Sequence, residues 1–270
     1  MAASEATVAG ALRTEAGAIA TLYVIPGSHA CRTGMLLLDH KRVPYRVVEL
    51  ITGLHPQLVR LRGFSGSAEP LRMVDGRPTR LSAMMDRFGT VPAVRFGNDR
   101  VQRNIEIARY LERLQPDPPL FPADPLLRAR VEEAERWGDE PLQMTARRIV
   151  LAAGARNLDE LHARGGAGRL GALLAHNDLQ RRMIATMAAR TTFDAGGEKD
   201  RKLIDALPPM LDRLDAWVAE GVLDGERLNA ADFMIAPSLA LLDYRLDIRP
   251  QLRARPAFAL VDRLLPEPPG

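Results

Sequence analysis

The pattern of hydrophobic and polar positions changes near residue 125. Before that point short apolar or alternating runs are interleaved with segments of helical spacing, whereas after it only helical spacing recurs. The first part predicts strands at 21–25, 44–50, 90–96 and 100–101, and helices at 30–40, 55–62 and 104–114. The strand, helix, strand succession at its start predicts a parallel βαβ unit.

The second part predicts helices alone, at 131–137, 141–153, 170–189, 202–219 and 230–242. Clustered prolines in 115–125 cannot continue a helix and indicate a linker. We therefore expect an α/β domain at 21–114, a proline-rich linker at 115–125 and an all-helical domain at 126–265. Residues 1–20 have the composition of a flexible extension and not the pattern of a signal peptide.

Residues 63–87 follow neither the helical spacing nor the alternation of a strand. Glycine and proline at positions 63, 66, 70, 76 and 78 interrupt the pattern, which predicts a loop with one helical turn at 81–85. A loop of this length inside a domain indicates an insertion or a functional lid.

Composition narrows the class of protein. The 270 residues are 46% hydrophobic and 26% charged, with a net charge of +3, as in ordinary globular proteins. No run of five like charges occurs, so we expect no nucleic-acid partner. No apolar run approaches the roughly 20 residues that a membrane-spanning helix needs, so we expect no membrane partner.

A single cysteine, Cys31, excludes an internal disulfide and any site with several cysteine ligands. It suits a reducing compartment, so we expect a cytoplasmic protein. The five histidines lack metal-ligand spacing, and no metal is expected. The Arg147-Arg148 pair and the acidic cluster at 132–136 are interpreted as solvated helix faces.

Several motifs occur in a recognisable order. They are Pro26-Gly-Ser-His-Ala-Cys31, Gly89-Thr-Val-Pro-Ala-Val94, Arg109-Tyr-Leu111, Leu120-Phe-Pro122 and Leu228-Asn-Ala-Ala-Asp232. Together with the helical second half, this set resembles the glutathione transferase family. The resemblance implies a thioredoxin-like α/β domain followed by an all-α domain.

The resemblance implies a role for Ser28 at the start of the first helix. A thiol near its ordinary pKa is mostly protonated at neutral pH. The positive end of a helix and a donated hydroxyl both favour the thiolate. By analogy with the serine-type classes, Ser28 would donate its hydroxyl to the sulfur of glutathione or another low-molecular-weight thiol. The alternative is a simple N-cap.

Cys31 lies three residues after Ser28. It could serve as a resolving or mixed-disulfide thiol, which would make the protein a glutaredoxin-like oxidoreductase. The alternative is that it packs as a small buried apolar residue.

The resemblance also assigns the thiol-binding positions. Pro92 matches the family's cis-proline, which would expose the backbone of Val91 for pairing with the ligand. His55 would bind a carboxylate. Gln102, Arg103 and Asn104 stand where the family has an acidic residue and a serine. Asn104 can still cap a helix and bind a carboxylate, but Arg103 would repel the γ-glutamyl ammonium, so a thiol that lacks this group would fit better.

The helical half supplies two further predictions. Trp137 and Met144 could line the pocket for an apolar electrophile, or could be core. Asn229 and Asp232 are expected to form a structural capping box.

Two classes of function remain. One is an enzyme that activates a bound thiol for attack on a small apolar electrophile or for thiol-dependent reduction. The other is a non-catalytic binding or scaffold protein of the same fold, with 63–87 covering the cleft. Fold alone does not separate them. The resemblance further implies a homodimer.

Overall fold

The computed structural model describes residues 19–66 and 71–268 of the chain. In this part the sheet has the order β2-β1-β3-β4. Its strands are β1 (Ala20–Val24), β2 (Tyr45–Glu49), β3 (Ala93–Phe96) and β4 (Asp99–Gln102). β1 is parallel to β2 and antiparallel to β3, and β3 is antiparallel to β4. The predicted parallel βαβ unit is present.

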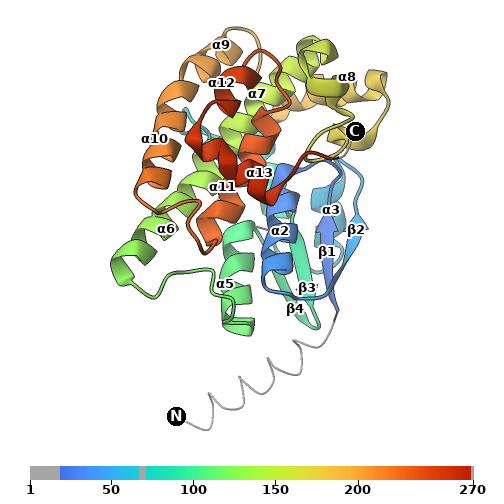
Figure 1. Cartoon of the computed structure of the whole chain (residues 1–270). Helices are drawn as coiled ribbons and strands as arrows, with labels where there is room; N and C mark the ends of the chain where they lie inside the picture. Colours follow the sequence, from blue (N-terminus) through green and yellow to red (C-terminus); the bar gives the residue numbers. More distant parts are fainter. Residues whose placement is uncertain (1–18, 67–70, 269–270) are drawn as a thin grey trace, which may run out of the picture.

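Residues 1–18 of the extension predicted at 1–20 lie outside the described residues, and Ala20 already belongs to β1. The helices of the α/β half are α2 (His29–His40), α3 (His55–Arg60), α4 (Arg80–Phe88) and α5 (Asn104–Leu114). α2 and α5 pack against each other and lie in front of the sheet in the view of Figure 1.

The remainder of the described chain is helical, as predicted. Its α-helices are α6 (Pro125–Trp137), α7 (Gln143–Arg156), α8 (Asp178–Met187), α9 (Glu198–Asp205), α10 (Leu207–Ala219), α11 (Ala230–Leu242), α12 (Arg249–Arg253) and α13 (Ala259–Leu264). A π-helical turn at Gly138–Leu142 joins α6 to α7. Together with the four-stranded sheet, this gives a thioredoxin-like α/β half followed by an all-α half.

Local signals move several of the predicted boundaries. Residues 170–177 contain only a short 3-10 helix at Leu173–Ala175 in place of the predicted α-helix. α8 begins at Asp178, where Asn177 caps it by accepting a hydrogen bond from the Gln180 N–H at 3.0 Å. The segment 202–219 divides into α9 and α10 at Ala206, where the prolines that follow suit a new first turn. α6 begins earlier than predicted, at Pro125, because Asp124 caps it.

The prediction of a loop with one helical turn in 63–87 was wrong at its C-terminal end. α4 runs from Arg80 to Phe88, and Thr79 caps it by accepting a hydrogen bond from the Ser82 N–H at 3.1 Å. The disruptive glycines and prolines all precede the cap, so they do not prevent the helix. The Thr79 hydroxyl also donates to the Thr192 carbonyl at 2.5 Å, which ties α4 to the helical half.

α11 is the central helix of the fold, with all of its residues buried (Figure 1). It packs against α2 of the first half and against α6 and α7 of the second. The predicted capping box is present. Asp232 accepts from the backbone N–H of Asn229 at 2.8 Å and from that of Asp224 at 2.7 Å, while the Asn229 side chain accepts from the Ala231 N–H at 2.9 Å.

A second contact between the halves uses an acid predicted to be solvated. Glu135 of α6 is fully buried and accepts two hydrogen bonds from the Arg109 guanidinium, at 3.1 and 2.7 Å. Burial raises the pKa of Glu135 to about 7, although the neighbouring guanidinium opposes this shift. The acidic cluster at 132–136 is therefore not uniformly a solvated face.

A buried lysine holds the linker. Lys41, at the C-cap of α2, has a side chain that is 0% exposed and pairs with Glu112 of α5. Its ammonium also donates to the carbonyls of Gln115 and Pro118, both at 2.6 Å. Glu112 in turn accepts from the Leu120 N–H at 2.9 Å. One charge pair thus joins the ends of α2 and α5 to the start of the linker.

Replacing this lysine should destabilise the whole fold. In Lys41→Met, Glu112 and the linker carbonyls lose their common donor, and we expect a loss of about 3–5 kcal/mol in the free energy of unfolding. Urea titration followed by circular dichroism measures it. The matched control is Lys199→Met, whose exposed pair with Asp194 contributes at most about 1 kcal/mol. An equal loss of unfolding free energy in the two variants would contradict the proposal that Lys41 holds α2, α5 and the linker together.

Candidate functional site

A cavity of about 420 Å³ lies between the two halves of the chain. Its lining comes from the N-terminus of α2, the turn before β3, α4, the π-helical turn, α7 and α8. Met84 and Met187 line it and are 48% and 57% exposed, so the cavity opens to solvent between α4 and α8. A volume of this size suits a small-molecule ligand.

Ser28 lines this cavity at the N-terminus of α2. Its Oγ accepts a hydrogen bond from the Cys31 N–H at 3.3 Å, which confirms the N-cap. An acceptor role leaves the hydroxyl proton available for a second group. Gly27 precedes it at φ +68°, and a Cβ there would meet the Ala172 carbonyl oxygen at 2.5 Å, so only glycine lets residues 172–173 approach this turn.

The neighbouring Cys31 is not part of the cavity lining. It is 2% exposed, and burial raises the pKa of its thiol to about 11. A thiol so protonated is a poor nucleophile at neutral pH. The geometry therefore favours the packing role of Cys31 over the redox role.

Val91 and Pro92 also line the cavity, and the peptide bond between them is cis, as expected. Val91 lies just before β3, beyond the last residue that pairs with β4. Within the described residues, neither its backbone N–H nor its carbonyl has a hydrogen-bond partner. This short stretch of backbone is free to pair with an extended ligand.

The three positions from the end of β4 to the start of α5 differ from their predicted roles. Gln102 does not line the cavity, because its Oε1 accepts from the Thr90 N–H at 3.3 Å. Asn104 does line it, but it is the first residue of α5 and not its cap. Its side-chain nitrogen donates to the Ala30 carbonyl at 3.0 Å, while Oδ1 is buried and has no hydrogen-bond partner in the part of the chain that the structure describes. Asn104 thereby ties α5 to α2.

Arg103 occupies the N-cap position of α5 with φ +71°, and its side chain reaches the cavity. One guanidinium nitrogen lies 3.9 Å from Oδ2 of Asp139 in the π-helical turn. Oδ1 of Asp139 accepts from the Gln143 side chain at 3.2 Å. Burial raises the pKa of Asp139 to about 6, and the nearby Arg103 opposes this shift.

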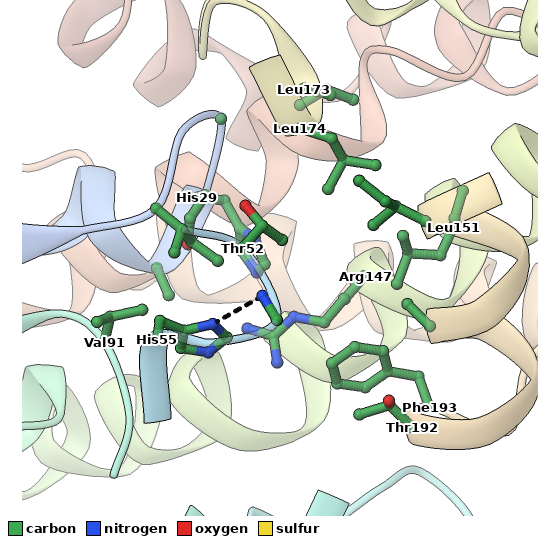
Figure 2. A pocket seen from close by; sticks show the side chains of 18 of the residues that line it. His29, Thr52, His55, Val91, Arg147, Leu151, Leu173, Leu174, Thr192 and Phe193 are labelled. Atoms are coloured by element: carbon green, nitrogen blue, oxygen red, sulfur yellow. Dashed lines mark hydrogen bonds between the residues drawn. The ribbon is translucent and has the colours of Figure 1, made fainter. Parts of the chain in front are cut away.

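The prediction that Arg147 and Arg148 form a solvated face was wrong. Arg148 is 2% exposed and donates to the Asp194 carbonyl at 2.8 Å. Arg147 extends from α7 into the cavity, where Figure 2 shows its guanidinium directed toward His55 with Phe193 beside it. Desolvation lowers the pKa of Arg147 below its usual value, and Asp86 opposes this effect. Part of its surface stays open because it faces the cavity.

Two histidines complete the polar end of the cavity, His29 and His55. His55 Nδ1 accepts from the Gly53 N–H at 3.3 Å, whereas His29 Nε2 is buried with no hydrogen-bond partner among the described residues. Burial and the Arg147 charge lower the pKa of both, that of His55 to about 4. Both rings are therefore neutral at pH 7.

The rest of the lining is mostly apolar. Met144, predicted as a pocket residue, does line the cavity. Trp137 does not, because it packs edge to face on Trp217 with ring centroids 5.3 Å apart. Side chains that the sequence analysis missed include Leu151, Leu173, Leu174 and Phe193. They come from segments far apart in the sequence, so no local motif points to them.

Comparison with known proteins identifies the fold. No protein-family model matches the sequence and no curated protein matches it. Solved structures do. A glutathione transferase of Phanerochaete chrysosporium has a TM-score of 0.59 at 17% identity, over 91% of this chain and 96% of that one.

Two further structures agree. A glutathione S-transferase of Ceriporiopsis subvermispora in complex with glutathione has a TM-score of 0.58 at 16% identity, over 93% of this chain and 100% of that one. A glutathione S-transferase of Rhodospirillum rubrum F11 has a TM-score of 0.51 at 19% identity, over 93% and 94%. The fold of this chain is that of the glutathione S-transferases, as the sequence motifs predicted.

The helices of residues 19–66 and 71–268 are too short or too polar to span a bilayer. Within the same ranges no three His, Cys, Asp or Glu side chains are grouped as metal ligands would be.

The low pKa of His55 gives a test of its burial. Between pH about 4 and 6.5 the unfolded chain binds a proton at this residue and the folded chain does not, so stability is lost as the pH falls through this window. In His55→Gln this part of the acid sensitivity should disappear, and the slope of unfolding free energy against pH should fall by at most about one proton. Urea titrations across the window measure both slopes, and parallel curves would contradict the prediction.

Proposed function

We propose that this protein is a glutathione-transferase-like enzyme that activates a low-molecular-weight thiol at Ser28. The observation that carries the proposal is the position of the Ser28 hydroxyl, at the N-terminus of α2 and on the wall of the cavity. Both the helix dipole and a donated O–H favour a thiolate over a thiol. The fold adds support, since one of the similar structures is a complex with glutathione.

The polar end of the cavity offers groups that suit such a thiol. The unpaired backbone of Val91 can form strand-like hydrogen bonds with the central part of the ligand. His55, neutral at pH 7, can hydrogen-bond a carboxylate through the ring nitrogen that Gly53 does not use. Arg103 has a cation where the resemblance expects an acid, which favours a thiol without an ammonium group at that end.

The reaction then requires that the thiolate and the electrophile lie next to each other in the cavity. The thiol loses its proton to solvent, the sulfur forms a bond to an electrophilic centre, and the leaving group departs with the bonding electrons. The apolar lining around Met144 and Leu151 suits a small apolar electrophile and keeps water from it. Thiol-dependent reduction at the same sulfur is the second reaction that this arrangement allows. We also propose that the protein is cytoplasmic and forms a homodimer. Analytical ultracentrifugation would test the homodimer.

Removing the hydroxyl tests the proposal directly. In Ser28→Ala the bound thiolate loses a charge-assisted hydrogen bond of about 1.5–3 kcal/mol, so the pKa of the bound thiol should rise by about one to two units. Ultraviolet absorbance of the thiolate, titrated with glutathione and with thiols that lack an α-amino group, measures this pKa. Calorimetry gives the affinity of each thiol.

Two controls separate catalysis from folding. Ser28→Ala also removes an N-cap, which costs about 1 kcal/mol of stability, whereas Ser28→Thr keeps both the cap and the donor and should keep the low pKa. Ser65→Ala changes an exposed serine outside the cavity lining and should change neither quantity. If no thiol binds to the wild type, the chain is a non-catalytic binding or scaffold protein of this fold.

A further inference from the structure

Arg147 has unused hydrogen-bonding capacity inside the cavity. One terminal nitrogen donates to the Gln143 side chain at 2.7 Å. No carboxylate of the described residues forms an ion pair with it. A guanidinium carries five N–H donors, so most of those on Arg147 have no acceptor among the described residues. The nearby Asp86 and Asp139 only partly offset the desolvation of this cation, so an anion bound to the remaining donors would stabilise it further.

The surroundings of Arg147 indicate what else the anion must carry. Its guanidinium carbon lies 5.0 Å from the centre of the Phe193 ring, and Leu151 follows one turn later on α7. Figure 2 shows Leu173 and Leu174 on the far side of Leu151 from Arg147. Ile184 and the exposed Met187 of α8 also line the cavity. The charge therefore stands beside a set of apolar lining side chains, which we call the channel.

The neighbouring acids limit the charge of the ligand. Asp86 and Asp139 are close enough to raise the pKa of Arg147. Asp86 Oδ2 accepts from the Leu71 N–H at 3.2 Å, and Asp139 lies beside Arg103. A dianion such as a phosphate would be repelled by both carboxylates, whereas a single carboxylate can meet the planar guanidinium through two hydrogen bonds.

We propose that Arg147 binds the carboxylate of an apolar monocarboxylic acid, whose hydrocarbon part fills the channel between α4, α7 and α8. The carboxylate site depends on Arg147 and not on Ser28. The inference rests on the proposed function in one respect only, namely that this acid is then the second substrate of the enzyme. The same carboxylate chemistry could come from the thiol, and the experiment distinguishes the two sources.

The probes are decanoate, octanoate and decanol, each titrated into the full-length protein by calorimetry. Decanoate should bind, and octanoate should bind about tenfold or more weakly, because each buried methylene strengthens binding about fourfold. Decanol has the same chain without the charge, and it should bind at least about tenfold more weakly than decanoate. Equal affinity for the acid and the alcohol would overturn the proposal with no variant needed.

Arg147→Met keeps much of the side-chain volume and removes the charge. It should lower the affinity for decanoate at least about tenfold and leave decanol unchanged. Arg147→Lys keeps the charge without the planar pair of donors, and its affinity should fall between the two. The matched control is Arg190→Met, an exposed arginine next to the cavity segment but outside its lining, which should bind decanoate as the wild type does.

Titration with glutathione shows whether the carboxylate that Arg147 binds belongs to the thiol or to the apolar acid. If Arg147→Met loses glutathione binding and keeps decanoate binding, Arg147 serves the thiol and the proposal is overturned. Ser28→Ala should bind decanoate normally. If decanoate binding depends on Arg147 while no thiol binds, the carboxylate site stands and the thiol-transfer function fails. If a thiol binds and decanoate does not, the carboxylate site fails alone.

Discussion

The fold depends on a helix that is buried among the others. α11 is buried along its whole length, so the free N–H groups of its first turn cannot be solvated. Asp232 and Asn229 satisfy this end from within the chain, and Asp232 also binds the loop before it through the Asp224 N–H. Burial raises the pKa of Asp232 to about 6, although the two N–H donors hold it down. The arrangement therefore depends on a carboxylate fixed in the interior.

What α11 holds in place is the cavity. Its packing against α2 and α7 sets the N-terminus of α2 opposite the side chains of α7, and the cavity lies between them. Ser28 lines the cavity from the start of α2 and Arg147 lines it from α7. The Glu135–Arg109 pair joins the same two halves at another place, and Lys41 holds α2 and α5 to the linker between them. The site is thus formed by an interface, which is where ligand cavities commonly occur.

Sequence reasoning succeeded where a signal is local. The strands, the Ser28 cap, the cis Val91–Pro92 bond and the Asn229–Asp232 box each depend on a few adjacent residues. It was wrong where the answer depends on tertiary packing. Arg147 is an unremarkable basic residue in a helical pattern, and only the approach of α4 and α2 encloses it. The same argument covers Glu135, whose burial needs Arg109 from another helix.

α4 is an element with a local signal that the sequence pattern did not reveal. Its cap at Thr79 and its helix are local features, but the glycines and prolines before them dominated the pattern. Its contribution to the site is long-range, because it supplies Asp86 and part of the apolar wall while Thr79 binds the Thr192 carbonyl across the mouth. A lid-like role for the 63–87 segment was an expectation from length alone. In the structure its C-terminal part, α4, forms a wall of the cavity.

The charges of the cavity constrain the proposed chemistry as a set. Arg103 and Asp139 lie within 3.9 Å, so a ligand ammonium at this end would have to compete with a guanidinium for the same carboxylate. Arg147 forms no ion pair within the described residues, and its guanidinium keeps N–H donors that a ligand carboxylate can use. Both facts favour ligands that lack an amine near the cavity wall. Asp86 and Asp139 already oppose the charges of Arg103 and Arg147, so the cavity suits a singly charged carboxylate better than a dianion, whose burial would leave more charge uncompensated.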